Sequence, residues 1–236
     1  MTTLVKPALL ARLRTSIPQV IDIWFEGVEA GAQSPGAAAM ARWWGFQRSR
    51  EENDRFNSQC REKFGAVLDD IKDLPAQSHA QQIAREMSEA STPLDKYHSV
   101  LGLVLLFDQM PRCIFPATNP LIYAHYDQIA QAVSQDAISK GLDAQANAKS
   151  MAWRLWFYMP LEHSESIEQH EQLARLLEEM KDDSPYYKNT SDFAARHHEI
   201  IEKFGRYPYR NEALGRQSTD SELEWIRQNG NPFATQ

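Results

Sequence analysis

The sequence predicts an all-α protein that folds as a single domain over residues 1–236. Apolar side chains recur at helical spacing along most of the chain, and no segment alternates convincingly between apolar and polar residues over five positions. Glycine is scarce, at 10 of 236 residues, which argues against the many tight turns of an all-β protein. Short links between successive helices predict antiparallel pairs that stack as a solenoid, although the sequence has no clean 34-residue repeat.

Local signals place the first helices. Two shorter helices are expected around Trp24 and Trp43, near the start of the chain. Ser49 and Glu52 have the spacing of a capping box, in which each residue satisfies a backbone N–H of the other. The helix that they start is expected to run to about Lys72.

Prolines and glycines mark most of the remaining boundaries. Thr92 is the predicted N-cap and Pro93 the first position of the next helix, which Pro111 prevents from continuing. Pro160 is expected to end an aromatic-rich helix in the same way. Further helices are predicted over residues 119–140, 143–158, 164–181, 191–204 and 219–229, with a polar loop over residues 182–189.

Charge and hydropathy exclude several kinds of partner. Lys plus Arg total 25 and Asp plus Glu total 32, so the net charge of −7 leaves no broad basic face for nucleic acid. The longest apolar run, residues 100–107, is far shorter than the roughly 20 residues of a membrane span, and the N-terminus lacks an apolar secretory signal. Cys60 and Cys113 alone make neither a disulfide framework nor a zinc site. We therefore expect a cytoplasmic protein with no nucleic-acid or membrane partner.

A first polar cluster lies at the predicted end of a helix. Asp108 is placed in the last turn, where the negative end of the helix macrodipole disfavours a carboxylate. Arg112 follows four residues later and could pair with Asp108, or both could face a ligand. A purely structural ion pair that fixes the chain reversal is an equally good interpretation.

A second cluster surrounds His163, at the entry to the next predicted helix. The positive end of that helix lowers the pKa of the imidazole, whereas Glu162 or Glu165 would raise it, so His163 could act as a general base near pH 7. The alternative is that His163 or Ser164 simply caps the helix. Metal binding is a poorer interpretation, because His163 and His170 lie seven residues apart, about 10 Å along a helix.

A third cluster, around Pro208, combines arginines with tyrosines. Proline favours an extended backbone before it, so Arg206 and Arg210 are expected to point the same way and to grip a carboxylate or phosphate. Arg216 is close enough in sequence to contribute. The arginines could instead bind helix carbonyls and nearby glutamates. His197 lies on the apolar stripe of the preceding helix, where a core histidine is favoured over a ligand-binding one.

These clusters resemble the signature blocks of one protein family. The blocks are Phe-Asp-Gln-Met-Pro-Arg, Tyr-Met-Pro-Leu-Glu-His-Ser-Glu and Phe-Gly-Arg-Tyr-Pro-Tyr-Arg-Asn, and the likeness extends from Trp24 to Trp225. The family is bacterial and fungal, of unknown function, with a tetratricopeptide-like all-α fold, so the resemblance implies this fold more firmly than any activity. Members usually carry Asn, Met and His where this chain has Cys113, Glu162 and Tyr209, which is consistent with a changed substrate.

The favoured hypothesis is a small-molecule site on the concave side of the helical array. There a cofactor-independent enzyme would carry out hydrolysis, elimination or isomerisation of an anionic substrate by acid–base chemistry. The sequence has no nucleotide fingerprint, glycine-rich phosphate loop or nucleophile elbow. The catalytic residues would be Asp108, His163 and Glu165, and the binding residues Arg112, Arg206, Arg210, His197, Trp153, Trp156, Tyr158, Asn211 and Arg216.

Two alternatives belong to other functional classes. Stacked helical pairs commonly present a groove, so a tetratricopeptide-like peptide-binding adaptor is the rival, with paired arginines on the peptide's terminal carboxylate. In the other alternative the polar clusters only cross-link helix ends. The enzyme hypothesis requires the stretches near positions 110, 163 and 208 to meet around a common cavity.

Overall fold

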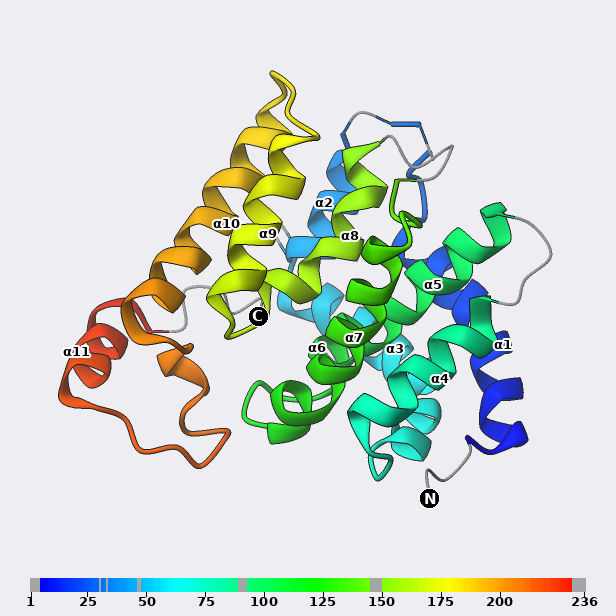
Figure 1. Ribbon diagram of the computed structural model, residues 1–236, viewed down its shortest axis with the longest axis horizontal. Helices are drawn as coiled ribbons and strands as arrows, with labels where there is room; N and C mark the ends of the chain where they lie inside the picture. The colour runs from blue at the N-terminus through cyan, green and yellow to red at the C-terminus, as the bar shows by residue number, and fades with distance from the viewer. Residues whose placement is uncertain are drawn as a thin grey trace.

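The computed structural model describes residues 5–29, 31–32, 34–45, 48–88, 93–144 and 150–230, and in these ranges the chain is helical and forms no strand (Figure 1). The all-α prediction is confirmed. The helices are α1 (Pro7–Trp24), α2 (Ala37–Trp44), α3 (Arg50–Ile71), α4 (Ala76–Ser88), α5 (Pro93–Asp108), α6 (Met110–Ile114), the π-helical turn η1 (Ile122–Tyr126), α7 (Asp127–Ser139), α8 (Met151–Glu162), α9 (Ile167–Glu178), α10 (Pro185–Phe204), the 3-10 turn η2 (Pro208–Arg210) and α11 (Asp220–Asn229).

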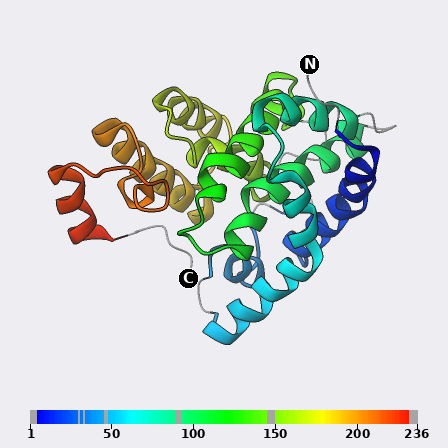
Figure 2. The ribbon, with the colours of Figure 1, turned by 90° about the horizontal axis from the view of Figure 1, so that it is seen from below.

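The helix α5 lies at the centre of the fold. It contacts α1, α4, α6, α7 and α8, and every residue from 100 to 108 is buried. The longest apolar run of the sequence is thus a core helix, and none of the described helices is long and apolar enough to cross a membrane. Figures 1 and 2 show α9 and α10 as an antiparallel pair next to α8, with α11 beyond them. A complete tetratricopeptide-like superhelix stays a prediction.

Two hydrophobic clusters hold these helices together. The larger extends from α1 to α10 and contains an aromatic group in which Trp156 packs edge-on against both Trp24 and Trp43, with ring centroids 4.9 Å apart in each pair. The smaller cluster joins Ile200 and Ile201 of α10 to Tyr207. This second cluster fixes the turn after α10, which carries part of the candidate site.

Capping boxes begin α3 and α11, as predicted. Ser49 and Thr219 each accept a hydrogen bond from the backbone N–H three residues later, where Glu52 and Glu222 accept one in return. The end of α10 is also as predicted, because Gly205 has a φ of +68°, the left-handed conformation that favours glycine after a helix.

Two predicted boundaries were wrong. The helix α8 continues through Pro160 to Glu162, because a proline in the last turn removes only one backbone donor. The helix α10 begins at Pro185 rather than near Ser191, because Ser184 caps it and proline suits the first helical position. Part of the loop predicted before it is therefore helical.

Other differences concern segments that the sequence reading left out or placed differently. No helix was predicted for α4, although Ala80, Ile83, Ala84 and Met87 recur at helical spacing on its buried face, next to the buried His79. The helix α8 begins at Met151, later than expected. The helix predicted from residue 119 is present but contains the π-helical turn η1 before α7. The predicted cap Thr92 lies outside the described residues.

Gly102 offers a test of how closely α5 packs against α1. An added Cβ would lie 2.7 Å from Ile17 Cγ2 and 3.1 Å from the Ile17 carbonyl oxygen. We expect Gly102→Ala to lower the free energy of unfolding by about 1–3 kcal/mol. In Gly65→Ala, the matched control, the new Cβ meets nothing nearer than Arg61 Cγ at 3.8 Å. That change should stabilise α3 by up to about 1 kcal/mol. Urea denaturation followed by circular dichroism measures both, and an unchanged midpoint for Gly102→Ala would contradict the packing.

Candidate functional site

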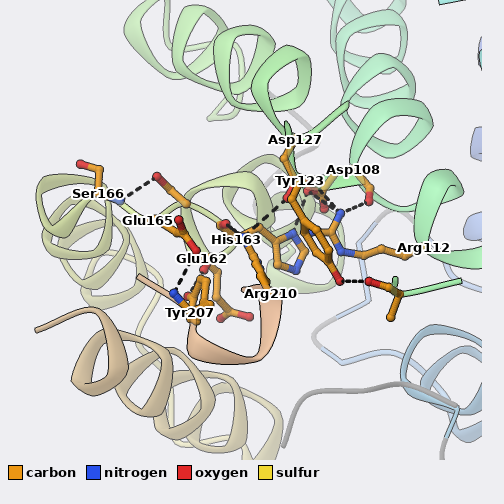
Figure 3. Close-up of polar contacts among 12 residues, drawn as sticks. Asp108, Arg112, Tyr123, Asp127, Glu162, His163, Glu165, Ser166, Tyr207 and Arg210 are labelled. Carbon is orange, nitrogen blue, oxygen red and sulfur yellow. Dashed lines mark hydrogen bonds and ion pairs between the residues drawn. The ribbon is translucent and has the colours of Figure 1, made fainter. Parts of the chain in front are cut away.

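Helix ends from all three predicted clusters meet around one cavity (Figure 3). The helix α5 stops at Asp108, α8 stops just before His163, and η2 brings Arg210 to the same place. The cavity volume is about 470 Å³, within the range of small-molecule sites, about 300–1,000 Å³. The residues that line it are Asn57, Arg61, Arg112, Cys113, Ile114, Phe115, Pro116, Ala117, Ile122, Tyr123, His163, His197, Tyr209 and Arg210.

Asp108 and His163 form a hydrogen-bonded pair beside this cavity. The Oδ1 atom of the buried Asp108 lies 2.7 Å from Nδ1 of His163, and Oδ2 accepts a hydrogen bond of 2.5 Å from Gln109 Nε2. An ionised carboxylate can only accept, so Nδ1 of His163 carries the proton and Nε2 is left with a lone pair. No described residue forms a hydrogen bond with Nε2, and the ring lines the cavity.

The electrostatics of the pair favour a neutral imidazole. Burial lowers the pKa of His163 below its ordinary value, and the charge of Arg112 adds to this effect, whereas Asp108 opposes it. Burial by itself would raise the pKa of Asp108, but His163, Arg112 and the hydrogen bond from Gln109 together lower it. A neutral imidazole oriented by an ionised carboxylate is the arrangement that a general base requires.

Arg112 connects this pair to α7. It donates to both carboxylate oxygens of Asp127, at 2.7 and 3.0 Å, and to the Asp108 carbonyl oxygen at 2.5 Å. Burial would lower the pKa of Arg112, but Asp127 and Asp108 raise it. The expected ion pair with Asp108 is therefore present. Nη1 of Arg112 lies 3.6 Å from Oδ1 of Asp108 and 2.7 Å from Oδ1 of Asp127.

Arg210 is a buried guanidinium with donors to spare. Its side chain is 5% exposed, and Nη1 donates to the carbonyl oxygen of His163 at 2.8 Å. The nearest carboxylate, that of Asp127, is 3.8 Å away, and the rings of Tyr207 and Tyr123 lie 4.3 and 4.7 Å from the guanidinium carbon. Its buried Nε finds no acceptor among the described residues. A group with several negative oxygens would supply the acceptors that Arg210 lacks.

Positive charge dominates the cavity wall. Arg61, Arg112 and Arg210 line it, and none of the described lining residues is acidic. Burial raises the pKa of Tyr209 to about 12, so its hydroxyl is protonated at neutral pH. No group of three or more His, Cys, Asp or Glu in the described ranges is placed to hold a metal ion. The cavity therefore suits an organic anion or a phosphate group better than a cation.

The structure does not bring Glu165 to His163. Its carboxylate accepts two hydrogen bonds from Arg216, at 2.6 and 3.0 Å, and one from the backbone N–H of Tyr207 at 2.9 Å. Burial would raise the pKa of Glu165, but these hydrogen bonds and the arginine charges lower it. Glu165 thus anchors the chain around η2, and Asp108 orients the histidine instead.

The predicted convergence of Arg206 and Arg210 was wrong. The segment Pro208–Arg210 is a 3-10 turn and not extended, so the two side chains separate. Arg206 forms a bidentate ion pair with Glu222, at 2.6 and 2.8 Å. Arg216 also donates to Asn211 Oδ1 at 2.9 Å. Arg206, Arg216 and Asn211 therefore bind parts of the chain to one another, and none of them lines the cavity.

The aromatic side chains that were predicted to line the site lie elsewhere in the fold. Trp153 stacks on Phe25 with ring centroids 3.7 Å apart, Tyr158 donates to Asp143 at 2.5 Å, and Trp156 belongs to the main core. Only the end of α8 reaches the cavity, so none of these three lines it.

Two further predictions concerned His197 as a binding residue and His163 or Ser164 as the cap of α9. His197 lines the cavity although it is buried, and its Nδ1 lies 3.0 Å from the carbonyl oxygen of Phe193. Neither His163 nor Ser164 caps α9, because Ser166 accepts the capping hydrogen bond from the backbone N–H of Gln169.

Sequence reasoning missed Asp127, Tyr123 and Arg61. Asp127 follows the buried Tyr126 and is itself 1% exposed. A π-helical turn contains one more residue per hydrogen-bonded ring than an α-helix, so η1 changes which side chains of α7 face inward. An acidic residue directly after an aromatic core position was the available signal.

The family described as "Bacterial protein of unknown function (DUF924)" matches residues 20–230 of this chain. The solved structure of protein of unknown function ATU0120 from Agrobacterium tumefaciens is similar, with a TM-score of 0.63 and 24% sequence identity over 91% of this chain and 98% of that chain. This likeness shows the fold alone. No curated protein matches the chain. The chain therefore belongs to the DUF924 family of bacterial proteins of unknown function.

Proposed function

We propose that the protein is a cofactor-independent enzyme that carries out acid–base chemistry on a small anionic molecule. The observation that carries this proposal is the 2.7 Å contact between Asp108 Oδ1 and His163 Nδ1, beside a cavity that Arg112 and Arg210 line. A base, a carboxylate that orients it and a cationic wall are the parts that such a reaction needs.

In this proposal His163 moves the proton. Its Nε2 accepts a proton from a substrate C–H or from a water molecule, and the resulting imidazolium returns that proton to the product or leaving group. Asp108 keeps the ring in the required tautomer and stabilises the imidazolium through the bond to Nδ1. Hydrolysis, elimination and isomerisation all use this cycle, and the choice between them depends on the substrate.

Arg210 and Arg112 would hold the anionic group of the substrate. Arg210 has the spare donors, and Arg112, although paired with Asp127, adds positive charge at the same wall. We propose a cytoplasmic setting, which agrees with two cysteines that are both free thiols.

A ligand screen tests the proposal. Small carboxylates, phosphate esters and peptides with free C-termini are compared by thermal shift, since a ligand at 100 times its Kd adds about 2.7 kcal/mol of stability. Stabilising compounds are then incubated with the protein and followed by NMR for conversion. Turnover of a small anion supports the enzyme. Stabilisation by peptides alone, without turnover, would favour the peptide-binding adaptor.

His163→Asn should remove the base and keep an N–H donor for Asp108. We expect kcat for the substrate that the screen identifies to fall about 10²–10⁴-fold, with an unchanged circular dichroism spectrum. His198→Asn is the matched control, because His198 packs on the ring of His170 with centroids 6.0 Å apart and does not line the cavity. Equal kcat values for the wild type and His163→Asn would refute the assigned role.

Arg210→Lys tests whether the planar guanidinium of Arg210, and not its charge alone, binds the substrate. Lysine keeps the positive charge but loses the planar fork of donors, so KM for an anionic substrate should rise roughly tenfold or more, with a smaller change in kcat. Arg206→Lys is the control, since Arg206 pairs with Glu222 away from the cavity and should leave KM unchanged. Steady-state kinetics of both variants measure this, and an equal effect of the two changes would contradict the role of Arg210.

A further inference from the structure

A second cavity lies between α2, α8 and α10. Its volume is about 280 Å³, near the lower end of small-molecule sites, about 300 Å³. It shares no lining residue with the cavity at His163. Most of its wall is apolar, formed by Met40, Trp44, Met159, Tyr186 and Phe193.

Glu162 places a buried carboxyl group in this wall. The residue is 4% exposed, and its carboxyl oxygens form no hydrogen bond with any described residue. The nearest basic atom is His197 Nδ1, at 3.7 Å from Oε1. Burial lowers the pKa of His197 well below its ordinary value, so this imidazole is neutral and brings no positive charge. A buried carboxyl without such partners is costly, which points to a ligand that supplies them.

Among the described residues, no permanently charged cation lies within ion-pair distance of the Glu162 carboxyl. Burial, with a smaller contribution from Asp108 on α5, raises the pKa of Glu162 to about 8, and Arg112 on α6 opposes this shift. An ammonium group beside the carboxyl would stabilise its ionised form. The aromatic rings of Trp44 and Phe193 in the same wall favour a cation as well.

The mouth of the cavity carries one acid and one base. Asp192 and Arg196 both line it and are exposed. Arg196 packs over the ring of Phe193, with its guanidinium carbon 4.9 Å from the centroid. These two opposite charges offset each other, so the buried carboxyl of Glu162 decides the charge that a ligand in this cavity should carry.

We propose that this cavity binds a small primary amine, whose ammonium group bonds to Glu162 and whose apolar body lies against Trp44 and Phe193. The site does not depend on the acid–base reaction proposed for the other cavity. The two sites prefer ligands of opposite charge, because arginines line one wall and a carboxyl the other.

Isothermal titration calorimetry with 2-phenylethylamine tests the proposal, with 2-phenylethanol as the uncharged probe of the same shape. The amine should bind the wild type at least roughly tenfold more tightly than the alcohol. Glu162→Gln should weaken amine binding roughly 30-fold or more and leave alcohol binding unchanged. Glu199→Gln, which changes an exposed glutamate of α10 outside the lining of this cavity, is the matched control and should bind both probes like the wild type.

A second readout does not depend on the variant. Binding of the amine at pH 7 should release the Glu162 proton, so the heat measured for the wild type should differ between buffers of different ionisation enthalpy. Failure of the amine to bind, equal affinity for amine and alcohol, or full amine binding by a folded Glu162→Gln protein would each overturn the proposal. If the variant does not fold, the two probes and two buffers on the wild type decide.

Discussion

The hydrogen bond between Asp108 and His163 joins the C-terminal ends of α5 and α8, and the candidate site is built around that meeting point. The C-terminal end of a helix is electronegative, since its last carbonyls lack partners within the helix. Two arginines supply partners and positive charge at these helix ends: Arg112 donates to the carbonyl of Asp108, and Arg210 donates to the carbonyl of His163. The same helix ends thus explain why a base, its orienting carboxylate and two guanidinium groups lie together.

Stability alone does not account for such an arrangement. Moving a charge out of water costs several kcal/mol per ion. Replacing a buried ion pair by well-packed apolar residues therefore often leaves a protein equally or more stable. Arg112 nevertheless donates to the Asp108 carbonyl at 2.5 Å and to the Asp127 carboxylate at 2.7 Å, and the buried Nε of Arg210 finds no acceptor among the described residues. Departures from local rules of this kind are expected where a protein binds or converts a ligand.

Local signals in the sequence were enough for most of the helices and for part of the site. Capping boxes at Ser49 and Thr219 are short-range patterns, so they could be read directly. The separation of Arg206 from Arg210 could not, because Tyr207, which precedes η2, is held by hydrogen bonds to Glu165 and to the Glu162 carbonyl, 42 and 45 residues away in the sequence. Asp127 was missed for a related reason: the π-helical turn before it is not visible in an apolar pattern of period 3.6.

Nitrogen-15 NMR of histidine-labelled protein, with the His163 signals assigned by their loss in a variant, tests the central claim most directly. The account predicts that at pH 7 His163 is neutral, with its proton on Nδ1 and none on Nε2, and that it titrates below the ordinary pKa of 6.5 because burial and Arg112 disfavour the imidazolium. A proton on Nε2 at pH 7, in either the other neutral tautomer or the imidazolium, would contradict it.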